Sequence, residues 1–134
     1  MLTVAPDPAQ AEQEFVTEVV RGMAAMCESG PAPDEARGDL TIPLGLSAWI
    51  VRSAVGLPDA YELLLRLRGA LLTVSGLDLR SEPIPLRVGE PRTALRSMGA
   101  YLFGLVDRAA RHAAVTPPDL AEAVITELTE ARRT

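Results

Sequence analysis

Apolar residues near the start of the chain recur every three or four positions, which is the spacing of one face of an α-helix. Asp7 is a suitable N-cap, Pro8 suits the first helical position, and Gly30 followed by Pro31 is a stop signal. The pattern therefore predicts a helix between Pro8 and Gly30. Its apolar face carries Phe15, Val16, Val19, Val20, Met23 and Cys27.

The stretch from Pro58 to Val74 is apolar over most of the circumference that a helix would have. At about 100° per residue, its polar positions form one narrow stripe of Glu62, Arg66, Gly69 and Thr73. A helix with so narrow a polar stripe has to be covered by neighbouring helices. We therefore expect this helix to be the centre of the fold.

Two amphipathic helices are predicted in the last third of the chain. The first runs from Pro91 to Ala113, and the second begins at Pro117, after the capping residue Thr116 and with Asp119 completing a capping box. Their apolar faces carry Leu95, Met98, Leu102, Leu105, Val106, Ala109 and Ala113 in the first, and Leu120, Val124, Leu128 and Ala131 in the second. No stretch alternates apolar and polar residues over the length of a strand.

The motif Ile-Pro-Leu occurs twice, beginning at Ile42 and at Ile84. Proline donates no backbone hydrogen bond and disfavours helix at the residue before it, so both copies predict extended connectors that could pair briefly as edge strands. An internal duplication is the alternative, but the offset from Ile to the next Arg-Ser pair grows from ten residues to twelve, at Arg52 and Arg96. We favour two connectors built alike.

The remaining segments complete the prediction of the fold. Residues 46–55 form a short helix, residues 30–39 a polar loop, and residues 1–6 and 132–134 flexible ends. The 134 residues fit one domain. The sequence thus predicts an all-α, single-domain bundle of four main helices and one short helix, orthogonal or up-down, with proline-containing extended connectors.

Composition and charge narrow the function. All 13 basic residues are arginine, which is typical of a GC-rich bacterial genome, and the net charge is −5. That charge argues against a nucleic-acid partner. Residues 1–50 carry eight acidic residues and two arginines, residues 51–115 nine arginines and six acidic residues, and residues 116–134 four acidic residues and two arginines. The basic middle favours either charge pairing between helices or contact with an anion or an acidic partner.

The sequence has few residues or segments that indicate a disulfide, a metal site or a targeting signal. One cysteine, Cys27, rules out an internal disulfide and favours a reducing cytoplasm. No secretory signal and no apolar run long enough to span a membrane are evident, so no membrane partner is expected. His112 is the single histidine and is expected to lie at the surface near a helix end.

Catalytic chemistry is not predicted. The all-α nucleotide pyrophosphohydrolases bind Mg²⁺ through acidic pairs on two different helices, whereas here Asp119, Glu122, Glu127 and Glu130 lie on one helix. Their shared side predicts a solvated face rather than a metal site. The chain also lacks a nucleophile motif and a glycine-rich phosphate loop. We expect no catalytic residue, no metal and no cofactor.

Two features of the predicted helices are unusual for a bundle that only buries its own core. Arg68 interrupts an apolar surface near Tyr61, and it could reach the rim, pair with a carboxylate across an interface, or bind an anionic ligand. The Pro91–Ala113 helix carries small residues on its outward side, which suit close approach of a partner helix or contact with an internal one.

These features predict a small cytoplasmic, non-enzymatic interaction or assembly module, most simply a homodimer that uses the surfaces of the short helix and the fourth helix. The alternative is a helical domain that binds, or binds and hydrolyses, an anionic small ligand or nucleotide in an arginine-lined cleft. The candidate interface or ligand residues are Arg68, Tyr61, Arg96, Ala100, Gly104 and Arg108.

Overall fold

A computed structural model describes residues 8–29, 44–57, 59–78, 84 and 89–133. The all-α prediction is confirmed, because the described residues form five helices and no strand. The helices are α1 (Pro8–Ser29), α2 (Leu44–Ser53), α3 (Ala60–Ser75), α4 (Pro91–Ala113) and α5 (Pro117–Arg133). The predicted polar loop and the predicted pairing of the Ile42 and Ile84 connectors lie outside the described residues.

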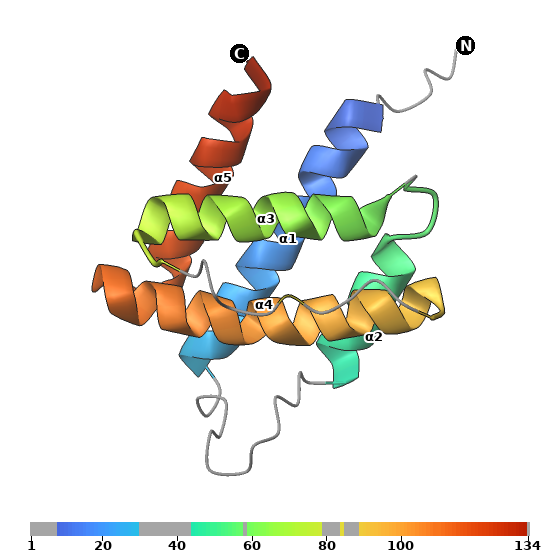
Figure 1. The fold of residues 1–134 in the computed structure, drawn as a ribbon, viewed down its shortest axis with the longest axis horizontal. Coiled ribbons are helices and arrows are strands. Elements are labelled where there is room, and N and C mark those ends of the chain that lie inside the picture. The colour runs from blue at the N-terminus through green and yellow to red at the C-terminus, as the bar shows by residue number, and fades with distance from the viewer. Residues whose placement is uncertain (1–7, 30–43, 58, 79–83, 85–88, 134) are drawn as a thin grey trace.

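The five helices form two layers. Helices α3 and α4 lie side by side in one layer, and α1, α5 and α2 cross behind them at steep angles (Figure 1). The arrangement is therefore the orthogonal form of the predicted bundle. Helices α1 and α4 each contact all four other helices, whereas α3 contacts α4, α5 and α1. The central place that the sequence assigned to α3 is thus shared with α1 and α4.

The helix ends follow local chemistry. The Asp59 side chain accepts a hydrogen bond from the Glu62 amide at 3.1 Å and caps α3. Helix α3 stops at Gly76, which has a φ of 75° and donates its amide to the Leu72 carbonyl. As the sequence predicts, Thr116 caps α5, its hydroxyl accepting from the Asp119 amide at 3.2 Å. Helix α3 thus begins two residues later and ends one residue later than the predicted range from Pro58 to Val74, whereas α5 begins at Pro117 as predicted.

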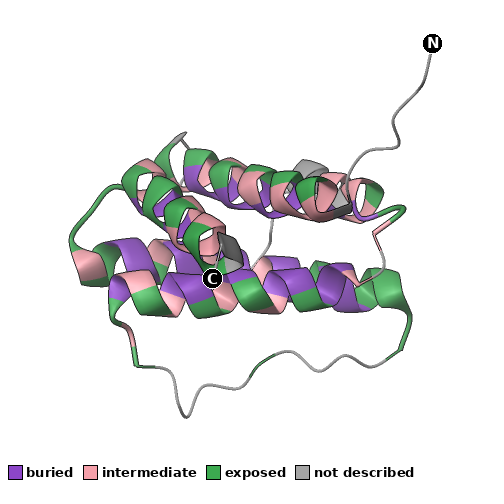
Figure 2. Ribbon diagram, turned by 90° about the horizontal axis from the view of Figure 1, so that it is seen from above, coloured by how far each residue is buried: buried purple, intermediate pink, exposed green. Residues whose placement is uncertain are grey.

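The core is aliphatic and lies between the two layers, where the buried faces of the helices meet (Figure 2). Its fully buried members include Met23, Leu64, Leu67, Met98, Leu102 and Leu105. The polar stripe of α3 is exposed, as predicted. Helix α2 differs from its prediction, because it begins at Leu44 and ends at Ser53. Val55 consequently lies in a turn beyond the helix, where it is 81% exposed.

Candidate functional site

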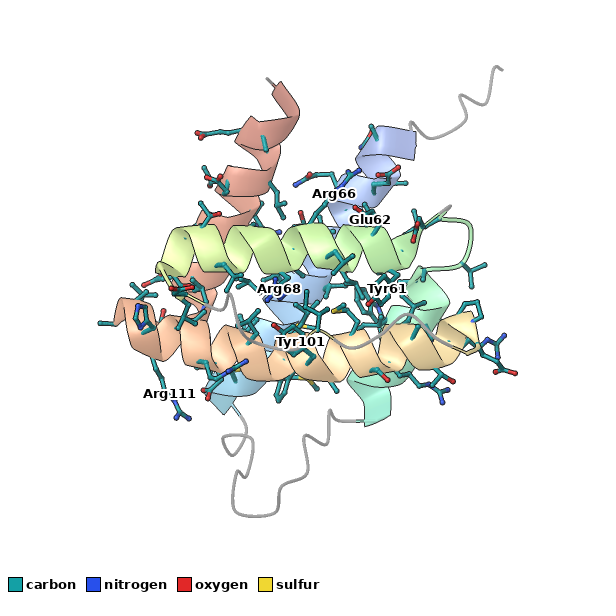
Figure 3. The ribbon with its side chains drawn as sticks, viewed as in Figure 1. Tyr61, Glu62, Arg66, Arg68, Tyr101 and Arg111 are labelled. Carbon is teal, nitrogen blue, oxygen red and sulfur yellow. The ribbon has the colours of Figure 1, made fainter. Side chains whose placement is uncertain are left out.

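Arg68 lies between α3 and α4, half-buried against Tyr101 (Figure 3). Its Nε donates a hydrogen bond of 2.8 Å to the Tyr101 hydroxyl, and its guanidinium carbon lies 5.8 Å from the centre of the Tyr101 ring. Within the described chain the guanidinium thus has a phenol as its partner rather than a carboxylate. Tyr61, the neighbouring candidate, is 8% exposed and belongs to the core.

The outward side of α4 carries the other predicted residues. Arg96 and Arg108 are exposed, and Ala100 and Gly104 are half-exposed between them. These four residues follow one another at intervals of four along the helix, so they form one continuous strip. The strip starts at Arg96, which also lines a groove between α4 and α2.

The groove between α2 and α4 has a volume of about 390 Å³. We call it the basic groove, because all of its charged lining residues are arginines: Arg52 from α2, and Arg92 and Arg96 from α4. Its apolar wall consists of Val51, Ala54, Val55, Pro91 and Leu95. The three guanidinium groups are exposed and form no ion pair within the described residues. The groove therefore places positive charge that no described carboxylate pairs with beside apolar surface.

A second groove lies on the other side of Val55, between α1 and α2, with a volume of about 380 Å³. We call it the acidic groove, because its charged lining residues are Glu14 and Glu18 of α1. The rest of its lining is Ala11, Phe15, Trp49, Ser53, Val55, Gly56 and Leu57. Both glutamates are exposed, and neither forms an ion pair in the part of the chain that the structure describes. Val55 is the residue that the two grooves share.

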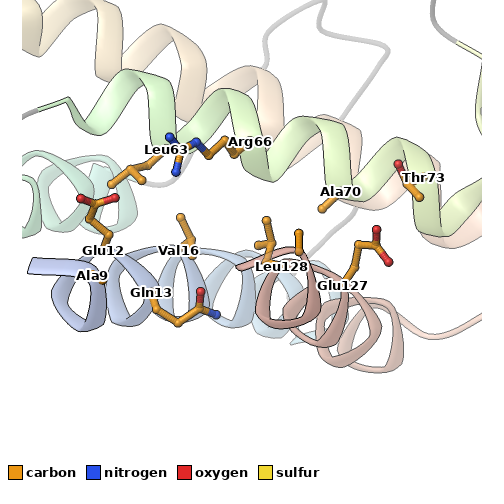
Figure 4. Close-up of a pocket in the computed structure, with 11 residues that line it drawn as sticks. Ala9, Glu12, Gln13, Val16, Leu63, Arg66, Ala70, Thr73, Glu127 and Leu128 are labelled. Atoms are coloured by element: carbon orange, nitrogen blue, oxygen red, sulfur yellow. The ribbon is translucent and has the colours of Figure 1, made fainter. Parts of the chain in front are cut away.

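A third groove, of about 580 Å³ and larger than the basic and acidic grooves, lies between α3 and the pair α1 and α5 (Figure 4). Its apolar lining includes Val16, Leu63, Ala70 and Leu128, and its charged residues are Glu12, Arg66 and Glu127. Because this groove contains one arginine and two carboxylates, its charges do not indicate whether a bound ligand would be an anion or a cation.

Of the α5 carboxylates that the sequence placed on a solvated face, Asp119, Glu122 and Glu130 are exposed, and Glu127 is half-buried. Glu122 accepts two hydrogen bonds of 2.9 Å from the Arg21 guanidinium, which ties α5 to α1. The same hydrogen bonds lower the pKa of Glu122 and raise that of Arg21. Glu127 is half-buried and lines the groove between α3 and the pair α1 and α5. Within the described residues no three potential metal ligands lie together.

The remaining reactive side chains lie away from the grooves. His112 is exposed in the last turn of α4, as expected from the sequence. Cys27 is half-buried, with its Sγ 4.0 Å from the Phe103 carbonyl oxygen, and burial raises the pKa of its thiol to about 11. A thiol with so high a pKa is a poor nucleophile at neutral pH. The described helices also include none with the length and hydropathy needed to cross a bilayer.

Comparisons of this chain with known protein families, curated proteins and solved structures find no match. Function has therefore to be inferred from the surfaces themselves. The basic and acidic grooves, with Val55 between them, combine exposed apolar surface with segregated charge. Of the residues there, the sequence pattern indicated Arg96 but not Val55, Arg52 or Arg92. The sequence signal that could have indicated Arg52 is the repeated Arg-Ser pair, because its two arginines, Arg52 and Arg96, both line the basic groove.

Proposed function

We propose that this protein is a non-enzymatic interaction module that assembles as a homodimer through the surfaces of α2 and α4. The observation that carries the proposal is Val55, which is 81% exposed between two grooves lined by further apolar residues. Exposed apolar surface rimmed by charged residues is typical of protein contact sites. The face continues along α4 from Arg96 to Ala100 and Gly104, where small side chains permit close approach.

The position of Arg68 also favours an interaction module over a ligand-binding enzyme. Arg68 lines none of the three grooves and is engaged by Tyr101 at the α3–α4 contact. A small anionic ligand in the basic groove is the alternative, favoured by its three arginines, which form no ion pair with another described residue. Among the described lining residues no carboxylate, histidine or cysteine accompanies them, so none of these residues offers a general acid or base for hydrolysis.

The proposed setting is the bacterial cytoplasm. It is supported by the all-arginine basic composition and by a single cysteine. Cys27 is a free thiol in a half-buried position, which is compatible with a reducing compartment.

The test replaces Val55 by aspartate and measures mass by sedimentation and light scattering. We expect the unmodified protein to have twice the 14.3 kDa mass of one chain at high micromolar concentration, and Val55→Asp to have the mass of a monomer. Gly104→Leu should also weaken the dimer by steric exclusion. The matched control is Val115→Asp, because Val115 is 42% exposed in the turn between α4 and α5. A monomeric unmodified protein would refute the proposal.

A further inference from the structure

Charge is segregated on the two sides of Val55. The basic groove lies on one side, with Arg52, Arg92 and Arg96, and the acidic groove lies on the other, with Glu14 and Glu18. The two grooves are also close in volume, about 390 and 380 Å³. One apolar residue therefore stands between two hollows of similar size and opposite charge.

None of these five charged side chains is neutralised by an ion pair in the described part of the chain. Elsewhere on the surface opposite charges do meet: Arg21 pairs with Glu122 at 2.9 Å and Arg111 with Asp107 at 2.8 Å. The side chains around Val55 thus keep charges that a partner of matching pattern could satisfy. The partner must be acidic opposite the basic groove and basic opposite the acidic groove.

A second copy of the same chain meets both requirements. We infer that two copies pack face to face around Val55, with the basic groove of each copy over the acidic groove of the other. The required two-fold axis lies in the contact plane, passes close to Val55 and runs between the two grooves. Such an axis makes the contact isologous, so each charge match occurs twice. This inference rests on the proposed homodimer and names the surfaces that meet in it.

The apolar and charged parts have different effects in this arrangement. The Val55 side chains of the two copies lie next to each other at the centre of the contact, where burial of apolar surface favours association. The long arginine and glutamate side chains project from the rims and set the orientation, because like charges placed opposite each other are strongly unfavourable. Copies turned to place acidic over acidic groove are disfavoured. The match also predicts weaker dimerisation at high salt, which screens exposed charges.

The test uses two complementary charge reversals in the full chain. The acidic variant carries Arg52→Glu and Arg92→Glu, and the basic variant carries Glu14→Arg and Glu18→Arg. All four side chains are exposed, so folding should be retained and is checked by circular dichroism. Each variant alone places like charges opposite each other, so its dimer dissociation constant should rise at least about tenfold. Glu130→Arg, exposed on α5, is a control that should leave dimerisation unchanged.

Mixing the two variants provides the decisive measurement. In an equimolar mixture every acidic groove can face a basic one, so a heterodimer should form with an affinity near that of the unmodified homodimer. A chain carrying all four substitutions should again form a homodimer. The inference is overturned if either variant alone dimerises normally, or if the mixture stays monomeric.

The outcomes separate this inference from the proposed function. If Val55→Asp abolishes the dimer while the charge variants have no effect, the homodimer stands and the groove pairing is wrong. If the unmodified protein is monomeric, both are wrong. In that case protection of Arg52 and Arg92 by inorganic phosphate or by an acidic peptide would identify the basic groove as a ligand site.

Discussion

Replacing Leu64 by alanine tests the assignment of α3 to the core. Leu64 is 0% exposed and faces the layer boundary. The substitution removes roughly three methylene equivalents at about 0.8 kcal/mol each, and the rigid surroundings add the cost of a cavity. We therefore expect the free energy of unfolding to fall by about 2.5–4 kcal/mol. The matched control is Leu65→Ala, because Leu65 is the next residue of the same helix and only half-buried.

Urea unfolding followed by circular dichroism measures both variants at one protein concentration, since dimerisation would couple stability to concentration. For 134 residues, an unfolding entropy of about 2.1 cal/mol/K per residue gives a fall in Tm of about 10 °C for a loss of 3 kcal/mol. Leu65→Ala should cost about 1 kcal/mol or less. Equal losses for Leu64→Ala and Leu65→Ala would refute the burial pattern of α3.

Two further predictions concern the α3–α4 contact and the cysteine. Tyr101→Phe removes the hydroxyl that accepts a hydrogen bond from Arg68, so the free energy of unfolding measured in urea should fall by about 0.5–1.5 kcal/mol. An unchanged free energy of unfolding would show that this hydrogen bond does not stabilise the fold. With its pKa near 11, Cys27 should be alkylated by iodoacetamide at pH 8 on the order of a hundredfold more slowly than an ordinary thiol. Denaturation should remove that difference, and rapid labelling of the folded protein would contradict the burial of Cys27.

Helix boundaries were readable from the sequence because their determinants are local. Proline at the first helical position and Thr116 as a cap act within one turn, so α4 begins and ends where predicted and α5 begins at Pro117. The end of α2 was less accurate. The sequence carried the apolar pattern on to Val55, but the helix ends at Ser53 and a turn places Val55 in solvent.

The side-chain contacts between different helices could not be predicted from such local signals. Arg68 and Tyr101 are 33 positions apart, and Arg21 and Glu122 are 101 apart. Periodicity shows which side of a helix is polar, but not which polar residue of another helix lies opposite. The carboxylates of α5 therefore looked equivalent in the sequence, although Glu122 binds Arg21 and Glu127 lines a groove.

The acidic first part and the basic middle of the sequence both pack against α2 in the fold. Within the described residues this helix contacts only α4, from the basic middle of the chain, and α1, from its acidic first part. Helix α2 thus packs against both parts, which also meet directly where α1 contacts α4, and Val55 follows the end of α2. Helix α2 has ten residues and is the shortest of the five, and among its described side chains only Ile50 is buried. Helix α2 contacts two other helices of the described chain, fewer than any other helix does, and its outer surface is the part of the fold that we propose a second copy completes.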